Sequence, residues 1–153
     1  MSTRDVNHIM IDLETLGTVP GCVGFSIGAC QFHPDIGSIS AEFYAVISVE
    51  DSLNKLLATD PDTEEWWSKQ SPEARAVLDQ AREPSARGLV EVLEEFNLWQ
   101  KDIGPKSSIR TWGNGADFDN PILRVMYDCA KVQPYAGGYG GRCYRTMKNL
   151  DEI

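Results

Sequence analysis

The chain has 153 residues, enough for one domain of ordinary size around a single hydrophobic core. Hydrophobic residues make up 42% of the chain and charged residues 24%, and no apolar run reaches the roughly 20 residues that span a bilayer, which excludes a helical membrane protein. The net charge of −9 argues against a protein that coats duplex nucleic acid through a broad basic surface.

The first predicted element is a buried strand that ends in two carboxylates. The apolar run Ile9 to Leu13 contains Asp12 and is followed by Glu14. Because side chains alternate along a strand, Asp12 and Glu14 leave the same face about 7 Å apart. Two neighbouring acids at the end of a buried strand need a cation or a metal, and no basic residue lies in this run. The first hypothesis is therefore a divalent-metal site; the alternative is a strand end that turns into solvent.

Alternating apolar residues predict two more strands, over 22–32 and 38–48, so that the N-terminal third forms an antiparallel three-strand meander. Two short helices are expected next, over 61–70 and 71–82. The second of them begins at Ser71, a residue type that caps helices, followed by a proline suited to the first turn.

Apolar residues at three- and four-residue spacing predict an amphipathic helix over 85–100. A short strand over 108–112 and a capped helix over 119–132 follow. The glycine-rich segment 136–141 lacks the spacing of a phosphate-binding loop and predicts a surface loop. The whole pattern predicts one α/β domain, in which a mixed sheet is flanked by helices.

A third carboxylate is expected where the strand over 108–112 leads into the next helix. Both Asp117 and Asp119 lie in this connection, within TWGNGADFDNPIL, and spacing alone does not choose between them. For either residue the alternative is a helix N-cap.

Several ordered motifs resemble the DEDD superfamily of 3′–5′ exonucleases, of the DEDDh type. The resemblance rests on DLET at 12–15, SIGA at 26–29 and NGADFDNPIL at 114–123. Two more segments, TEEWWSKQSPEAR at 63–75 and YRTMKNL at 144–150, are most similar to phage and prophage exonucleases of the exodeoxyribonuclease VIII kind and to related exoribonucleases. This resemblance implies a ribonuclease-H-like fold and a 3′–5′ exonuclease acting on single-stranded DNA or RNA ends. The four cysteines show no CxxC or zinc-type spacing, so reduced thiols are expected, in the cytoplasm of a bacterium or a phage-infected host.

The same resemblance implies a set of site residues. It assigns catalysis and metal binding to Asp12, Glu14 and Asp119, so it favours Asp119 over Asp117. Two divalent ions, Mg²⁺ or Mn²⁺, are expected, with Asp12 bridging them, since hard oxygen ligands suit both metals. Substrate contacts are expected from Thr15, Leu16, Trp67, Asn114 and Phe118. Trp66, Trp67 and Trp112 are candidates for stacking a terminal base, and the alternative for each is a place in the core.

The chain departs from the superfamily at the third motif, which carries a fourth acid and, in one subclass, a general-base histidine. The two histidines here are His8 and His33. His8 lies about 13 Å from Asp12 along the strand, too far to act as the base, and His33 is expected on the surface. Asp151 is a poor substitute for the acid. We therefore expect residues 1–153 to be an exonuclease-like domain without the C-terminal helix of the third motif, and with weak or lost activity.

Two other classes of function remain as alternatives. One is a non-catalytic remnant that binds nucleic acid or protein through the same fold. The other is a haloacid-dehalogenase-like phosphatase, whose DxDxT motif DLETLGT partly matches, although Glu14 departs from it. A homodimer is also expected, since a second copy would cover a sheet left open by a missing helix.

Overall fold

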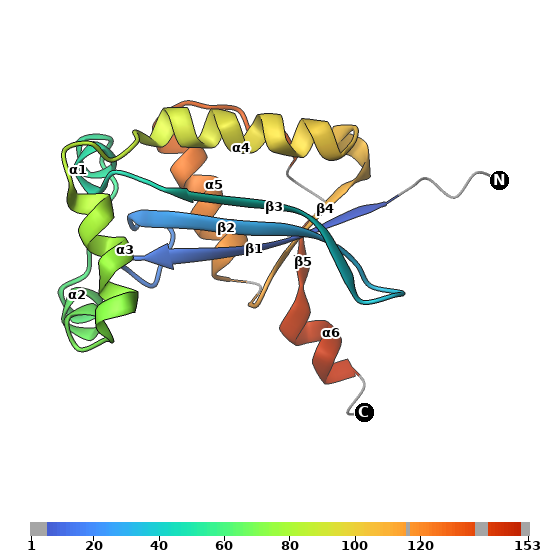
Figure 1. Ribbon diagram of the computed structural model, residues 1–153, viewed down its shortest axis with the longest axis horizontal. Coiled ribbons are helices and arrows are strands. Elements are labelled where there is room, and N and C mark those ends of the chain that lie inside the picture. Colours follow the sequence, from blue (N-terminus) through green and yellow to red (C-terminus); the bar gives the residue numbers. More distant parts are fainter. Residues whose placement is uncertain (1–5, 116, 137–140, 151–153) are drawn as a thin grey trace.

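The computed structural model describes residues 6–115, 117–136 and 141–150 (Figure 1). At its centre these residues form a mixed sheet in the order β3-β2-β1-β4-β5. Strand β2 is antiparallel to both β1 and β3, whereas β4 is parallel to β1 and β5 is parallel to β4. The strands are Asn7–Thr15 (β1), Gly24–His33 (β2), Ser38–Val46 (β3), Ile109–Gly113 (β4) and Arg142–Cys143 (β5).

The described helices gather on one face and one end of this sheet. Helices α4 and α5 cover the face, and α1, α2 and α3 cluster at the end toward which β1 points, while α6 extends away beyond β5 (Figure 1). The helices are Val49–Asn54 (α1), Pro61–Ser68 (α2), Pro72–Arg82 (α3), Leu89–Ile103 (α4), Asp119–Ala130 (α5) and Tyr144–Leu150 (α6), with a 3-10 turn over Lys106–Ser108 (η1). None of the helices described has the length and apolar character needed to cross a membrane.

The core lies between the helix-covered face of the sheet and helices α4 and α5. Alternate residues of β1 are buried there, as the period of a strand requires: Ile9, Ile11 and Leu13. Phe96 of α4 and Met126 of α5 belong to the same buried cluster. The intervening residues of β1 point to the opposite face, so this strand separates the core from the face that carries the paired acids.

Helix α4 is anchored by a residue of α1. Its N-cap, Gly88, has no side chain to accept a bond from the first turn. Asp51 of α1 supplies one instead: its Oδ2 accepts a 2.8 Å bond from the N–H of Leu89, and its Oδ1 pairs with Lys55 at 2.7 Å. The carboxylate therefore does the work of a cap from a distant part of the sequence.

The predicted elements appear in the predicted order, with differences at their ends. The helix expected from residue 85 starts at Leu89, because the chain forms a turn at residues 84–85 and is extended at Gly88. The second strand starts at Gly24, and Cys22 instead forms an isolated bridge with Ala58. Helix α5 begins at Asp119 without any side-chain cap, so the expected cap is wrong. Residues 137–140 of the glycine-rich segment, and Asp151, lie outside the described residues.

Candidate active site

Asp12 and Glu14 share the sheet face that does not carry the core. Asp12 is exposed and Glu14 is half-buried. Their neighbours across the ladder in β2 are small, Gly28 opposite Asp12 and Ser26 opposite Glu14. Small neighbours leave both carboxylates room to reach a ligand. The geometry predicted from the two-residue spacing is confirmed.

Asp119 reaches the same region from the first turn of α5. Strand β4 pairs with β1 from Asn7 to Met10, and beyond Met10 no described residue pairs with β1 as a strand on that side. The N–H of Leu13 donates instead to Oδ1 of Asp119 over 3.1 Å. Asp119 is 3% exposed, whereas Asp117 is on the surface. Of the two acids that spacing left open, the structure brings Asp119 to the strand.

A glycine makes this approach possible. A Cβ placed on Gly113, at the end of β4, would lie 3.2 Å from Cβ and 3.3 Å from Oδ2 of Asp119. Both separations are tight, so a side chain here would push Asp119 away from β1. The end of β4 and the start of α5 therefore fit together because residue 113 has no side chain.

The three carboxylates affect one another electrostatically. Burial raises the pKa of Asp12, and burial followed by repulsion from Asp12 and Asp119 raises the pKa of Glu14. Burial also raises the pKa of Asp119, helped by the charge of Asp12 and opposed by the N–H of Leu13. The Asp12 side chain is exposed to solvent, yet its carboxylate loses part of its hydration because the sheet and neighbouring groups lie close to it. The bond from Leu13, which lies between Asp12 and Glu14 in β1, brings Asp119 to the same stretch of the strand.

No lysine or arginine neutralises this group within the described part of the chain, where none of the recorded ion pairs includes Asp12, Glu14 or Asp119. Carboxylates that repel one another in partly dehydrated surroundings are a donor set that suits a hard divalent cation. Among these same residues, however, no group of three potential ligands is already close enough to hold an ion. The side chains have the chemistry for a metal without a preformed cage.

A groove of about 580 Å³ opens beside Glu14 and runs toward α2. Trp66 is 55% exposed in it, whereas Trp67 is 7% exposed. Trp67 donates its indole N–H to the carbonyl of Thr15 over 2.8 Å and packs edge-on against Phe25. The groove is lined by Leu13, Glu14, Thr15, Gly17, Thr18, Asp60, Asp62, Thr63, Trp66, Trp67 and Phe118.

The residues expected to bind substrate fall into three groups. Thr15, Trp67 and Phe118 line the groove, although most of the Trp67 ring belongs to the core. Leu16 is fully buried and is not part of the lining, so a direct contact from its side chain is not supported. Asn114 is exposed in the loop after β4, where its carbonyl accepts a 3.1 Å bond from Arg145, and it does not line the groove.

Sequence reasoning missed the groove residues Gly17, Thr18, Asp62 and Thr63. Asp60 carried a usable signal, since an Asp before Pro61 is a typical N-cap, and it accepts from the N–H of Thr63. Capping fixes the start of α2, and that start forms one wall of the groove. Gly17 and Thr18 lie in the loop after β1, and Asp62 and Thr63 lie in the first turn of α2, where no apolar periodicity marks them.

Both histidines lie away from this chemistry, as expected. His8 packs against Phe32 and Trp112, and the indole N–H of Trp112 lies 3.1 Å from its Nδ1. An indole N–H only donates, so Nδ1 is the acceptor and the ring is neutral. Burial, with Arg110 and Arg142 nearby, accordingly lowers the pKa of His8. His33 is exposed beside Ser40.

Comparison with protein families gives one match over nearly the whole chain: a family model described as a 3′–5′ exoribonuclease Rv2179c-like domain fits residues 7–153. No curated protein sequence matches. The narrower resemblance to phage and prophage exonucleases is not supported by these comparisons.

Solved nuclease structures share the fold. The nuclease domain of 3′hExo, a DEDDh family member bound to rAMP, is 13% identical with a TM-score of 0.61, covering 100% of this chain and 72% of that one. Cell-death related nuclease 4 is 10% identical with a TM-score of 0.61, and the chain is 95% covered but spans only 47% of that protein. Escherichia coli exonuclease I in complex with a dT13 oligonucleotide is 17% identical with a TM-score of 0.58, covering 85% of this chain and 25% of that one. The ribonuclease-H-like fold predicted from the sequence is confirmed.

Proposed function

Because the chain belongs to the family of 3′–5′ exoribonuclease Rv2179c-like domains, which are exonuclease hydrolases, we propose that it removes nucleotides one at a time from the 3′ ends of single-stranded RNA or DNA. This proposal is supported by the bond from Leu13, between Asp12 and Glu14 in β1, to Asp119, and by the position of Glu14 in the lining of an open groove. Two elements far apart in sequence bring these acids together, and no basic residue described here neutralises them.

The proposal includes divalent cations, Mg²⁺ or Mn²⁺, held by Asp12, Glu14 and Asp119. When bound, such ions supply the charge that activates water and offsets the negative charge developing during phosphodiester hydrolysis. Asp119 accepts a bond from the N–H of Leu13 through its Oδ1. Its backbone bond fixes the orientation of the side chain before any ligand arrives.

The groove gives the substrate a place next to the acids. Trp66 offers an exposed indole face, and stacking of a base on such a face is worth about 1–3 kcal/mol. Phe118 immediately precedes Asp119 and lines the same groove, so it adds a second aromatic wall close to the acids. These contacts recognise any base through its flat face, which suits an enzyme that must accept successive nucleotides.

A non-catalytic binding module is the second candidate, favoured by the absence of a preformed three-ligand group among the described residues. The test is a time course with 5′-labelled single-stranded RNA and DNA oligonucleotides in Mg²⁺ and in Mn²⁺, beside an Asp12→Asn control. We expect a ladder that shortens from the 3′ end and is missing in the control. Binding of the oligonucleotide without any shortening would instead support the binding module and reject the exonuclease.

A further inference from the structure

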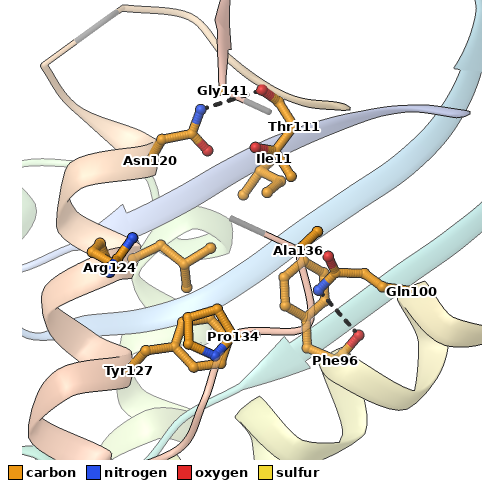
Figure 2. Close-up of a pocket in the computed structure, with 11 residues that line it drawn as sticks. Ile11, Phe96, Gln100, Thr111, Asn120, Arg124, Tyr127, Pro134, Ala136 and Gly141 are labelled. Carbon is orange, nitrogen blue, oxygen red and sulfur yellow. Dashed lines mark hydrogen bonds between the residues drawn. The ribbon is translucent and has the colours of Figure 1, made fainter. Parts of the chain in front are cut away.

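A second cavity lies on the opposite side of β1 from the paired acids. It has a volume of about 120 Å³ and sits between α4, α5 and the buried side of the sheet (Figure 2). Ile11 lines it, and the side chain of Ile11 leaves the face of β1 opposite to Asp12. Phe96, Tyr127 and Pro134 add flat walls. Among the described residues, none lines both this cavity and the groove described above.

Gln100 is a polar residue in an apolar position at this cavity. The buried face of α4 carries Leu89, Val92, Leu93 and Phe96, and the same spacing places Gln100 next. Gln100 is 2% exposed. Its Nε2 makes a long bond of 3.4 Å to the carbonyl of Phe96, and no donor from the described residues reaches its buried Oε1. A buried acceptor without a donor is costly, so this position is built for a ligand atom that donates.

The facing wall comes from α5 and contributes a cation. Arg124 lines the cavity and is exposed, so its guanidinium lies at the solvent side. It forms no recorded hydrogen bond or ion pair with another described residue. Tyr127, by contrast, is already engaged, since its hydroxyl donates to Asn97 over 2.7 Å. Figure 2 shows Gln100 and Arg124 on opposite sides of the cavity, with the apolar side chains between them.

We propose that this cavity binds pyrimidine nucleoside 5′-monophosphates. Its volume is close to the roughly 150 Å³ of an apolar cavity that admits benzene, which suits one six-membered ring and excludes a purine. A glutamine amide presents an acceptor beside a donor, which matches the adjacent N–H and carbonyl of a pyrimidine edge. The guanidinium of Arg124 matches the geometry of a phosphate.

This assignment rests on the proposed function, because nucleoside monophosphates are what a 3′–5′ exonuclease releases. The ligand would be a product held away from the acids. Asn120, which lines the cavity, directly follows Asp119 in the chain, so the product site and the proposed catalytic site share the first turn of α5.

The test is isothermal titration calorimetry of the full chain with uridine 5′-monophosphate in EDTA, where metal-dependent binding at the acids is abolished. We expect saturable binding that persists in Asp12→Asn and weakens about fivefold in Gln100→Leu, the factor that one ordinary hydrogen bond supplies. Arg124→Met should make uridine 5′-monophosphate bind no better than uridine. Gln100→Leu removes the unpaired acceptor, so circular dichroism and thermal melting should show it folded and at least as stable as the wild type.

Two measurements on the wild type keep the test independent of the variants. Adenosine 5′-monophosphate should not bind, because a purine exceeds the cavity, and inorganic phosphate alone should not compete. The proposal would be overturned by equal binding of both nucleotides, or by binding that Gln100→Leu leaves unchanged. It would also be overturned by no binding at all, which would mean that water fills the cavity. The oligonucleotide ladder, run on the same preparation, distinguishes failure of this site from failure of the exonuclease.

Discussion

The backbone N–H of Leu13 donates to Oδ1 of Asp119, a residue 106 positions later in the chain, over 3.1 Å. This bond replaces the strand pairing that β1 loses where β4 ends. Asp119 therefore has two separate roles, as a backbone acceptor that completes the sheet edge and as one of the three clustered carboxylates. The first role depends on a side-chain oxygen that accepts a hydrogen bond, and the second depends on the negative charge of the carboxylate.

Substitutions at Asp119 should separate these roles. In Asp119→Asn the amide oxygen still accepts from Leu13, so stability is kept while exonuclease activity falls by at least about 10- to 100-fold, the loss seen even when partners of metal ligands are changed. Asp119→Ala leaves a buried N–H without an acceptor and costs a further 1–3 kcal/mol or so. Urea unfolding and the ladder assay measure the two effects. Equal stability of the two variants would contradict this account of the bond.

The clustered acids should make stability depend on pH in the absence of metal. Their folded-state pKa values are raised, so just above the unfolded carboxyl pKa of about 4 the folded state binds more protons than the unfolded state. The free energy of unfolding contributed by these groups therefore decreases as pH rises through that window toward neutrality. Urea unfolding in EDTA, at about pH 5 and about pH 7, should show a smaller decrease in Asp12→Asn than in the wild type. An identical pH slope in both proteins would count against the coupling.

Divalent metal should relieve the same repulsion. Mg²⁺ or Mn²⁺ is expected to raise the midpoint of thermal unfolding of the wild type, since a ligand that binds the folded state alone stabilises it. Glu14→Gln should show a smaller rise, and Asp117→Asn, which removes a carboxylate outside the cluster, is the matched control that should behave like the wild type. EDTA should abolish the ladder of the wild type and of Asp117→Asn. If the metal-induced rise in the unfolding midpoint persists in Glu14→Gln and disappears in Asp117→Asn, the metal binds at a different site.

The paired acids on β1 were predictable because the two-residue period of a strand is local. Asp119 was not fixed by pattern, since its selection over Asp117 depends on where β4 stops pairing with β1. Which of Trp66 and Trp67 is buried was also not predictable. Neighbouring residues on a helix point in different directions, and tertiary packing decides which one enters the core. Helix α1, six residues long, is too short to show a helical period.

Asp51 should be a structural residue sensitive to acid. Hydrogen bonding to Lys55 lowers its pKa, and the bond from Leu89 adds to that effect. A lowered folded-state pKa contributes stability above the unfolded value, and this contribution is lost as pH falls through the folded-state pKa. Asp51→Ala should lower the free energy of unfolding by about 0.5–2 kcal/mol, as loss of a helix cap does. Activity at low temperature should stay unchanged, because Asp51 does not line the groove; a selective loss of activity would show otherwise.

Substitution of the two tryptophans of α2 should affect different properties: stability at Trp67 and substrate binding at Trp66. Trp67→Phe removes the N–H that donates to Thr15, with an expected cost of about 1 kcal/mol, and disturbs the strand end that holds Glu14. Trp66→Ala should change stability by less than about 0.5 kcal/mol and raise KM for oligonucleotides, with little change in kcat. Thermal melting and steady-state kinetics of the two variants give the comparison. A Trp66→Ala variant with unchanged KM would remove the indole from substrate binding.

Adjacent positions of α2 thus differ in their freedom to vary during evolution. Residue 67 is tied to the end of β1 by a backbone bond and to the core by Phe25, so few side chains can replace its indole. Residue 66 contacts solvent over most of its surface and carries no such bond in the described structure. Replacement at position 66 changes the lining of the groove while the acids keep their positions. Under the proposed function, variation at this position would change the contacts that the groove makes with a substrate base and leave the acids in place.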